Sequence, residues 1–459
     1  MDVDEARWLT WEPGHGETLR AALERTLREA IRTGALRESV RLPSSRALAQ
    51  ALGVSRGVVS DAYGQLEAQG FLVTRSRTAP VVARVPRTDV VRREPEAPAR
   101  APRYDLTPTT PDVTLFPLAR WLAAAQHVAR RASTTTLDYR EPRGERVLRE
   151  ALADHLGRTR GVIAEPEQIV VVQGTAQGIC LLLHVLSARS ASGVAVEDPS
   201  HTTQHERIRA FGFELVPRPV DHHGMVVAGL EADAVLVTPA HQFPTGSVLS
   251  GERRRELLAW SHAGGGLIVE DDYDAEFRYD REPVRALQGV APEQVIQLGT
   301  VSKTLAPALR LGWLVAPPGL ADDAARTKRL LDDFSPALDQ LTLAEVLTRG
   351  HYDRHVRRAR AVYRARRDRL LAALAKHLPE LTVEGVAAGV HLLLRLPPGV
   401  DDRTVADAAR NASIAVPPLS AFRIRPSDDG GLVIGYGRLH ESTVAAATRS
   451  LAKLVRAHL

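Results

Sequence analysis

The chain has 459 residues, which is too long for one hydrophobic core and predicts at least two domains. Its hydrophobic content of 44% and charged content of 25% are typical of a globular protein. The single cysteine, Cys180, excludes an intrachain disulfide and a cysteine-based zinc site. Because no secretory pattern opens the chain and polar residues interrupt its most apolar stretch, we expect a cytoplasmic protein without a membrane span.

Positive charge is concentrated in the N-terminal part of the chain. Residues 20–84 contain 11 Arg and 5 acidic residues, a net charge of +6, whereas residues 105–459 carry a net charge of only +1. A basic module on a nearly neutral body fits a polyanion partner such as DNA. A solvated basic surface in an arginine-rich chain explains the charge equally well, so charge alone does not decide.

Three helices are predicted near the N-terminus. Leucine or isoleucine at every fourth residue predicts an amphipathic helix over residues 17–34. Ser44 or Ser45 can cap a short second helix, Gly53 supplies a turn, and Ser55 can cap a third helix.

Two short strands follow these helices, at residues 71–74 and 81–83. Three helices and a two-stranded wing form a winged helix-turn-helix, an α+β DNA-binding domain that we assign to residues 1–83. Residues 84–104 are rich in Pro, Arg and Glu and are predicted to be an extended linker.

From residue 105 onward, short apolar runs alternate with helical stretches, which predicts an α/β domain on a largely parallel sheet. The runs are residues 169–172, 193–196, 234–237, 267–269, 295–298 and 312–315. From about residue 345, a long arginine-rich helix, strands at 390–396 and 432–436 and a final helix predict a smaller α+β lobe. Residues 105–459 are therefore taken as one second domain.

Lys303 is the first residue that points to chemistry. The chain has only four lysines, and Lys328, Lys376 and Lys453 lie in charged helical stretches where we expect them to be exposed. Lys303 instead follows the predicted strand 295–298. Lysine can lose its proton and form an imine, whereas arginine cannot, so Lys303 is predicted to be the Schiff-base lysine for pyridoxal 5′-phosphate (PLP).

A PLP site also needs an anion for the ring nitrogen, a donor to the phenolate oxygen and a phosphate cup. Asp271 and Tyr273, at the end of the strand 267–269, are candidates for the first two roles. A helix start after strand 169–172 and side chains around Lys303 suit a phosphate. The cup residues are Gly174, Thr175, Ala176, Thr300, Ser302 and Arg310. Each of these sequence features alone more often belongs to a helix cap or a polar loop. Their occurrence in this order, each at the end of a predicted strand, favours a PLP site.

The whole chain resembles the MocR subfamily of GntR-type transcription regulators, whose C-terminal domain is similar to the fold-type I aminotransferases. The resemblance is carried by residues 42–46 (LPSSR), 53–56 (GVSR), 138–144 (DYREPRG), 238–246 (TPAHQFPTG) and 270–279. It implies that Arg46, Ser55 and Arg56 contact operator DNA. It also implies a homodimer in which Tyr139 reaches the PLP phosphate of the partner subunit; Tyr139 could alternatively be a core residue.

The chain departs from the aminotransferase pattern at the substrate end. The stretch 432–436 lacks the arginine that usually clamps a substrate carboxylate, so Arg423 or Arg438 is a candidate substitute, or none is. Phe243 stands where many aminotransferases have an asparagine that binds the PLP phenolate, and His241 or Gln242 can replace that contact. His201 either stacks on a ligand or fills a turn.

The wing also departs from the family, since the tip at residues 75–80 has no glycine. Insertion of the wing into a minor groove is therefore not expected.

These features predict a PLP-dependent transcription regulator that senses PLP itself, or an amine or amino acid that condenses with the cofactor. The alternative is an aminotransferase acting on a 2-amino acid, with the DNA-binding module as an accessory. The missing carboxylate clamp counts against the alternative.

Overall fold

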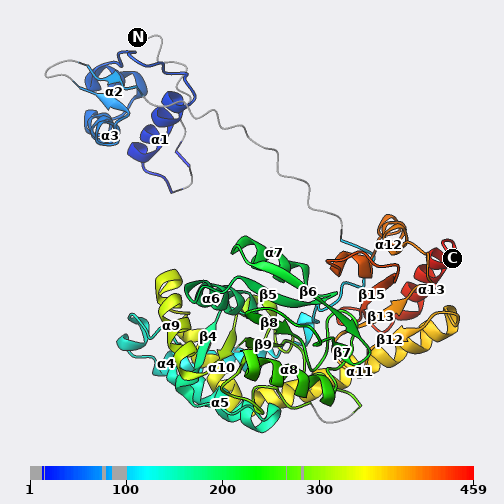
Figure 1. Ribbon diagram of the computed structural model, residues 1–459. Coiled ribbons are helices and arrows are strands. Elements are labelled where there is room, and N and C mark those ends of the chain that lie inside the picture. Colours follow the sequence, from blue (N-terminus) through cyan, green and yellow to red (C-terminus); the bar gives the residue numbers. More distant parts are fainter. Residues whose placement is uncertain (1–12, 15, 75–78, 85–100, 265, 281–283) are drawn as a thin grey trace. The chain divides into compact units, whose positions relative to one another are not determined.

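The computed structural model describes residues 13–14, 16–74, 79–84, 101–264, 266–280 and 284–459 (Figure 1). Contacts divide the chain into two compact units, Met1–Ala99 and Arg100–Leu459. The wing tip at residues 75–78 and most of the predicted linker lie outside the described residues.

The first unit has three helices and a two-stranded antiparallel sheet. They are α1 (Leu19–Arg32), α2 (Ser45–Leu52), α3 (Arg56–Ala68), β1 (Leu72–Val73) and β2 (Val81–Val82). Their apolar faces enclose one core, which includes Leu23, Leu27, Leu48, Val59 and Leu66. The predicted winged helix-turn-helix is confirmed.

The hydrogen bonds of this unit show which of the predicted residues cap its helices. The Ser44 hydroxyl accepts the Ala47 N–H at 3.2 Å, so Ser44 is the cap of α2. Ser55 accepts the Val58 N–H at 3.4 Å and caps α3. Gly53 ends α2 with a φ of +66°, a left-handed conformation that favours glycine.

An eight-stranded sheet forms the centre of the second unit, in the order β4-β11-β10-β9-β8-β5-β6-β7. The strands are β4 (Ile169–Val172), β5 (Gly193–Asp198), β6 (Glu214–Asp221), β7 (Gly224–Met225), β8 (Ala234–Val237), β9 (Leu267–Asp272), β10 (Val295–Thr300) and β11 (Gly312–Val315). All six predicted apolar runs form strands of this sheet. Only β11 and β7 run antiparallel to their neighbours, so the largely parallel α/β prediction is confirmed.

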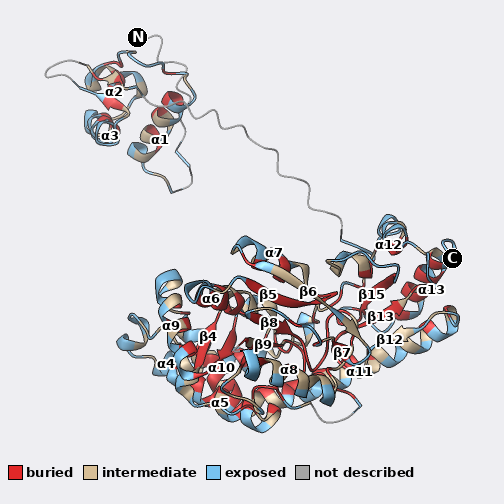
Figure 2. Cartoon of the chain, viewed as in Figure 1, coloured by how far each residue is buried: buried red, intermediate tan, exposed pale blue. Residues whose placement is uncertain are grey.

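Helices cover the sheet, and Figure 2 shows its strands buried beneath helices with exposed outer faces. These helices are α4 (Leu118–Arg131), α5 (Arg146–Arg160), α6 (Thr175–Ala188), α7 (Thr202–Ala210), α8 (Gly251–Gly264), α9 (Pro318–Asp332) and α10 (Ala337–Thr348). Strands β4, β5, β8, β10 and β11 are buried on both faces because helices pack on each side, as in other parallel sheets. In the described part of the chain, no helix is long and apolar enough to cross a membrane.

The smaller α+β lobe follows. It contains α11 (His351–His377), β12 (Val383–Glu384), β13 (His391–Arg395), α12 (Asp402–Asn411), β14 (Ile414–Ala415), β15 (Gly431–Gly435) and α13 (Val444–Arg456). Strand β14 pairs with β3 (Tyr104–Asp105), which closes the lobe with the first residues of the second unit. The long helix α11 joins both cores, since Tyr352 packs with the sheet helices and Leu374 packs within the lobe.

Candidate cofactor site and DNA-binding face

The predicted cofactor residues meet at one edge of the central sheet. Gly174 follows β4, Asp271 lies at the end of β9, and Lys303 follows β10. Strands β9 and β10 are parallel, with Leu298 opposite Asp271. The carboxyl ends of neighbouring strands in such sheets form the usual ligand-binding edge.

Lys303 is held close to this edge by its amine. Its Nζ donates to the Thr109 carbonyl at 2.6 Å. Burial lowers the pKa of Lys303, and the nearby Asp274 and Asp271 carboxylates only partly oppose that shift. A larger neutral fraction of the amine is what imine formation requires.

Asp271 has one satisfied and one unsatisfied oxygen. Its Oδ2 accepts from Gln204 Nε2 at 2.8 Å, whereas its buried Oδ1 has no hydrogen-bond partner among the residues that the structure describes. Burial raises the pKa of Asp271 to about 7. An unpaired buried acceptor is costly, and a protonated pyridine nitrogen would satisfy it, so the residue fits the predicted ring-nitrogen role.

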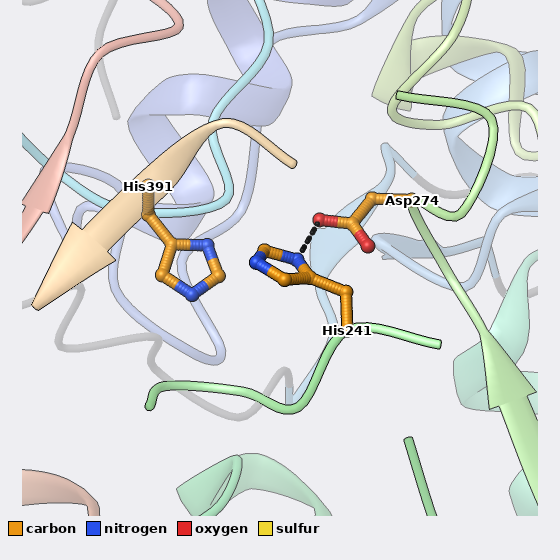
Figure 3. Close-up of side chains that lie close together, drawn as sticks. All are labelled: His241, Asp274 and His391. Carbon is orange, nitrogen blue, oxygen red and sulfur yellow. Dashed lines mark hydrogen bonds and ion pairs between the residues drawn. The ribbon is translucent and has the colours of Figure 1, made fainter. Parts of the chain in front are cut away.

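Tyr273 lies against a buried polar cluster of His241, Asp274 and His391, the three side chains that Figure 3 shows. His241 Nδ1 lies 2.9 Å from Asp274 Oδ2 and 3.3 Å from the Tyr273 hydroxyl. Burial raises the pKa of Tyr273 well above its ordinary value, so the phenol keeps its proton and can donate it in a hydrogen bond.

His391 is the member of this cluster that the sequence did not reveal. It begins β13 and is buried, and neither ring nitrogen has a hydrogen-bond partner within normal geometry. Burial above all, and the proximity of other groups that could carry positive charge, hold the pKa of His391 well below its usual range. The ligand atoms of His241, Asp274 and His391 lie within 4.8 Å of one another, so they could also hold a metal ion.

The predicted phosphate cup surrounds the start of α6. Gly174 has a φ of +82°, and a Cβ built there would lie 3.0 Å from the Arg310 guanidinium. Thr300 Oγ1 donates to Ser302 Oγ at 2.9 Å, and the Arg310 guanidinium donates to the Gln173 carbonyl. A glycine-lined cradle of hydroxyls, a guanidinium and a helix N-terminus suits a phosphate dianion.

Lys328 is not exposed, and that prediction is wrong. Its side chain is fully buried and pairs with Asp332 at 2.7 Å. Asp332 also accepts from Gln177 Nε2 at 2.6 Å, and Gln177 Oε1 accepts the Gln173 N–H at 2.8 Å. The partner four residues along α9 and the packing of α9 on α6 bury a lysine that its charged sequence context suggested was solvated.

Tyr139 is 84% exposed, and its ring meets the edge of Phe334 at 6.0 Å. This exposure excludes the core alternative. A side chain reaching away from its own unit is compatible with the predicted contact to a partner subunit.

In the first unit, the three predicted DNA contacts lie together on an exposed surface. Arg46 is in the first turn of α2, Ser55 caps α3, and Arg56 begins α3. Arg56 Nε lies 3.4 Å from Ser45 Oγ, which brings the starts of both helices close together. Exposed guanidiniums beside helix N-termini are suited to phosphate oxygens and guanine edges.

Two family models match the two units. Residues 19–82 match bacterial regulatory proteins of the gntR family, and residues 109–444 match aminotransferase class I and II. A pyridoxine biosynthesis transcriptional regulator, PdxR, of Corynebacterium glutamicum is 32% identical over 94% of this chain and 95% of that protein. The chain belongs to the MocR subfamily of GntR-type transcription regulators.

Other relatives agree with this assignment. A probable rhizopine catabolism regulatory protein, MocR, of Rhizobium meliloti is 31% identical over 93% of this chain and 91% of that protein. An archaeal alanine:glyoxylate aminotransferase matches with a TM-score of 0.72 and 27% identity, over 78% of this chain and 91% of that structure. The aminotransferase fold of this MocR-type chain implies a PLP site.

The substrate end of the site in this MocR-type chain is apolar. His201 stacks on Phe243 with ring centroids 3.9 Å apart and planes 8° apart. Phe243 packs in a buried cluster with Tyr273, Leu393, Leu419 and Val433. His201 therefore has a ring partner within the chain, so both interpretations of this residue stay open.

The candidate clamp arginines have partners elsewhere. Arg438 forms an ion pair with Asp105 at 3.2 Å, and Arg423 lies 3.8 Å from the Asp429 carboxylate, but the Arg423 Nε is buried without a hydrogen-bond partner among the described residues. The Gln242 amide donates to the Pro199 carbonyl at 2.8 Å. These contacts do not place either arginine or the amide at Lys303.

Proposed function

We propose that this protein is a PLP-dependent transcription regulator that binds operator DNA through its first unit. Its second unit would sense PLP itself, or an amine or amino acid that reacts with the bound cofactor. The observation that carries the cofactor assignment is the buried, unpaired Asp271 Oδ1 at the sheet edge that holds Lys303.

Each predicted residue would hold one part of the cofactor. Asp271 would keep the ring nitrogen protonated, Tyr273 would donate to the phenolate oxygen, and the cup around Gly174 would bind the phosphate. His241 would orient the Tyr273 hydroxyl, which lies 3.3 Å from its Nδ1. When bound, PLP supplies an aldehyde that Lys303 and a primary amine can each engage.

A sensing role is favoured over efficient transamination by the substrate end of the site. Val433 is fully buried in an apolar cluster with Phe243, and the strand stretch 432–436 that contains it has no arginine to bind a substrate carboxylate. A buried carboxylate without a paired cation would be strongly disfavoured. The ligand would then alter DNA binding through its different affinity for two arrangements of the protein.

The alternative function, an aminotransferase acting on a 2-amino acid, is favoured by the similarity to the archaeal alanine:glyoxylate aminotransferase. Steady, multiple-turnover transamination with a common amino acid would support it. A single turnover that ends with one equivalent of product, or no reaction, would support the regulator.

We also propose a homodimer. Exposed apolar side chains of the second unit lie on α4, α10 and the turn at residues 134–137, which contact one another, and on the end of α9, where Phe334 just beyond it meets the Tyr139 ring. They are Leu118, Leu122, Leu137, Tyr139, Leu330, Leu331 and Leu338. Exposed apolar patches of this kind mark protein interfaces, and Tyr139 within the patch would reach the partner's phosphate cup.

The cofactor assignment is tested by Lys303→Ala. The protein mixed with PLP should show the absorption band of a protein-bound imine, and the variant should lack it because no other amine is placed at this sheet edge. Lys453→Ala is the matched control, since Lys453 is exposed on α13 of the smaller lobe. A band that persists in Lys303→Ala would contradict the assignment.

The DNA assignment is tested by replacing Arg46 and Arg56 with Ala. Both side chains are exposed, so folding should be unaffected, and loss of two guanidinium contacts should abolish a gel-shift on the upstream DNA of the gene. The imine band should stay unchanged in the same protein. Retained, sequence-specific binding by the double variant would show that DNA is read elsewhere.

A further inference from the structure

A second cavity lies outside the cofactor site, where the C-terminal end of α5 meets the N-terminal part of α11. Its volume is about 300 Å³, which is at the lower end of the range for small-molecule pockets. Four arginines and two carboxylates contribute to its lining: Arg158, Arg160, Arg357, Arg360, Glu276 and Asp353. The proposed regulator function leaves this cavity unexplained.

Two cations of the lining balance its two carboxylates. Burial disfavours charge on His155, but the Asp353 carboxylate, 3.5 Å from Nδ1, and the Glu276 carboxylate, 3.2 Å from Nε2, raise the pKa of His155 to about 9, so it is protonated at neutral pH. Arg158 Nη1 lies 3.7 Å from Asp353 Oδ2. His155 and Arg158 therefore lie against Asp353 and Glu276, although Arg158 pairs more closely with Asp154, at 3.0 Å.

The remaining arginines are not all compensated. Arg160 binds both oxygens of Asp272, at 2.8 and 3.0 Å, and is neutralised there. Arg360 donates only to the backbone carbonyl of Glu276, at 3.0 and 2.7 Å. Arg357 has no hydrogen bond or ion pair within the described part of the chain. In the described part of the chain, neither Arg357 nor Arg360 has a carboxylate within ion-pair distance, although His155 first and then the Arg158 and Arg357 charges lower the pKa of Asp353. Two such guanidiniums facing one cavity favour a doubly charged oxyanion.

The same cavity is connected to the Lys303 segment by hydrogen bonds. Glu276 Oε2 accepts from the Tyr352 hydroxyl at 2.7 Å, and that hydroxyl lies 2.9 Å from Thr304 Oγ1. His355, on the same helix as Tyr352, lies 2.6 Å from the Thr304 carbonyl through its Nε2. Because Thr304 directly follows Lys303, a shift of α11 or of Glu276 would change the position of Lys303.

We propose that this cavity binds a small phosphate-type oxyanion through Arg357 and Arg360, and that its occupancy changes the affinity for PLP at Lys303. The binding part is independent of the proposed function, whereas the coupling part rests on it. The ligand would be a second effector, recognised at a site separate from the cofactor.

The binding part is tested by titrating sodium phosphate into PLP-loaded protein in a calorimeter, so that the cofactor's own phosphate occupies the cup. Sodium chloride at equal ionic strength is the reference. Arg357→Gln should weaken binding roughly tenfold or more, because a charge-assisted contact is lost. Arg358→Gln is the matched control: Arg358 is exposed on the same helix but does not line the cavity, and binding should be retained.

Three results would overturn the binding part. They are no phosphate binding by the wild-type protein, no loss in Arg357→Gln, and an equal loss in both variants, which would indicate a diffuse basic surface. If PLP does not load, the titration is done on cofactor-free Arg310→Gln, which removes the guanidinium of the cup. The cavity is then still tested although the proposed function has failed.

The coupling part is tested by measuring PLP affinity from the imine absorption with and without phosphate. Free phosphate also competes with PLP for the phosphate cup, and this competition lowers PLP affinity in the wild type and in Arg357→Gln alike. The coupling between the two sites is therefore the part of the change in PLP affinity that is lost in Arg357→Gln. We expect it to be about fivefold or more, as is usual between linked sites. Tyr352→Phe should remove the same part while phosphate binding stays, because only the bridging hydroxyl is lost; an unchanged response in either variant would overturn the coupling.

Discussion

Asp271 combines two properties that give opposite expectations for stability and for cofactor binding. Its Oδ1 is buried without a partner, and burial raises its pKa to about 7, compared with an ordinary value of 3.8. The folded, cofactor-free protein therefore holds this proton more tightly than the unfolded chain does. Its contribution makes the protein less stable as pH rises from about 4 to about 7.

Asp271→Asn is accordingly expected to leave the cofactor-free protein at least as stable as the wild type at pH 8, where the buried carboxylate is ionised. PLP affinity should fall roughly ten- to hundredfold, because the charged partner of the ring nitrogen is lost. Thermal unfolding without PLP and absorbance titration with PLP measure the two effects.

Glu197→Gln is the control for this experiment. Glu197, on β5, is equally buried and burial raises its pKa to about 7, but its carboxylate accepts the N–H of Thr238, the residue after β8, at 3.1 Å. Its replacement should change PLP affinity little. Equal losses in both variants would mean that Asp271 acts through general packing.

At the scale of elements, the sequence predicted the strands of the sheet well and the polar cluster poorly. Continuous apolar runs such as 234–237 identify strands buried on both faces, because neither face of such a strand meets solvent and neither needs polar residues. Strand β6 was missed, since its residues are mostly half-buried and include two prolines.

The cofactor site was predictable where residues follow strands, as Asp271 and Lys303 do. His391 was not, because a single histidine at the head of an apolar run gives no sign that the small lobe brings it beside His241. The burial of Lys328 likewise depends on helix α9 packing on α6, which local sequence does not report.

The junction of α5 and α11 has a pH dependence of its own. Burial opposes charge on His155, yet Asp353 and Glu276 raise its pKa to about 9 from an ordinary 6.5. A group whose pKa is raised on folding stabilises the protein fully below its unfolded pKa and loses that effect as pH rises through the folded value. The contribution, about 3 kcal/mol as an upper estimate, should therefore disappear between pH 6.5 and 9.

We expect the midpoint temperature of thermal unfolding of the wild type to fall as pH rises over this range. The midpoint of His155→Gln should fall less. The variant should be less stable than the wild type at pH 6.5 and should approach it at pH 9.5. Thermal denaturation followed by circular dichroism gives both curves. Parallel curves for the two proteins would show that His155 does not carry a stabilising charge.

At the scale of the whole molecule, the second unit has a site that opens at its surface and an apolar patch beside it. Arg310 of the cup and Tyr139 of the patch are both exposed. Leu330 is 87% exposed and Leu137 is 71% exposed, values that are unusual for leucine unless another surface covers it. A second copy of the chain would cover the patch and bring a tyrosine to each phosphate cup, as expected for a two-fold interface.

This arrangement predicts that oligomeric state and PLP affinity change together. Light scattering should give the wild type a mass of twice 50.0 kDa, and Leu137→Glu combined with Leu330→Glu should give the monomer mass because charges are placed in an apolar interface. PLP affinity should fall in the same protein, since Tyr139 can no longer reach a partner. Tyr139→Phe should stay dimeric but bind PLP more weakly, because only the hydroxyl contact to phosphate is lost.

Val290→Glu is the matched control for the interface. Val290 is 64% exposed, but it lies before β10 and away from α4 and α10. It should remain dimeric with unchanged PLP affinity. A monomeric wild type that binds PLP normally would contradict the shared site, whereas a dimer that survives both leucine substitutions would place the interface on another surface of the unit.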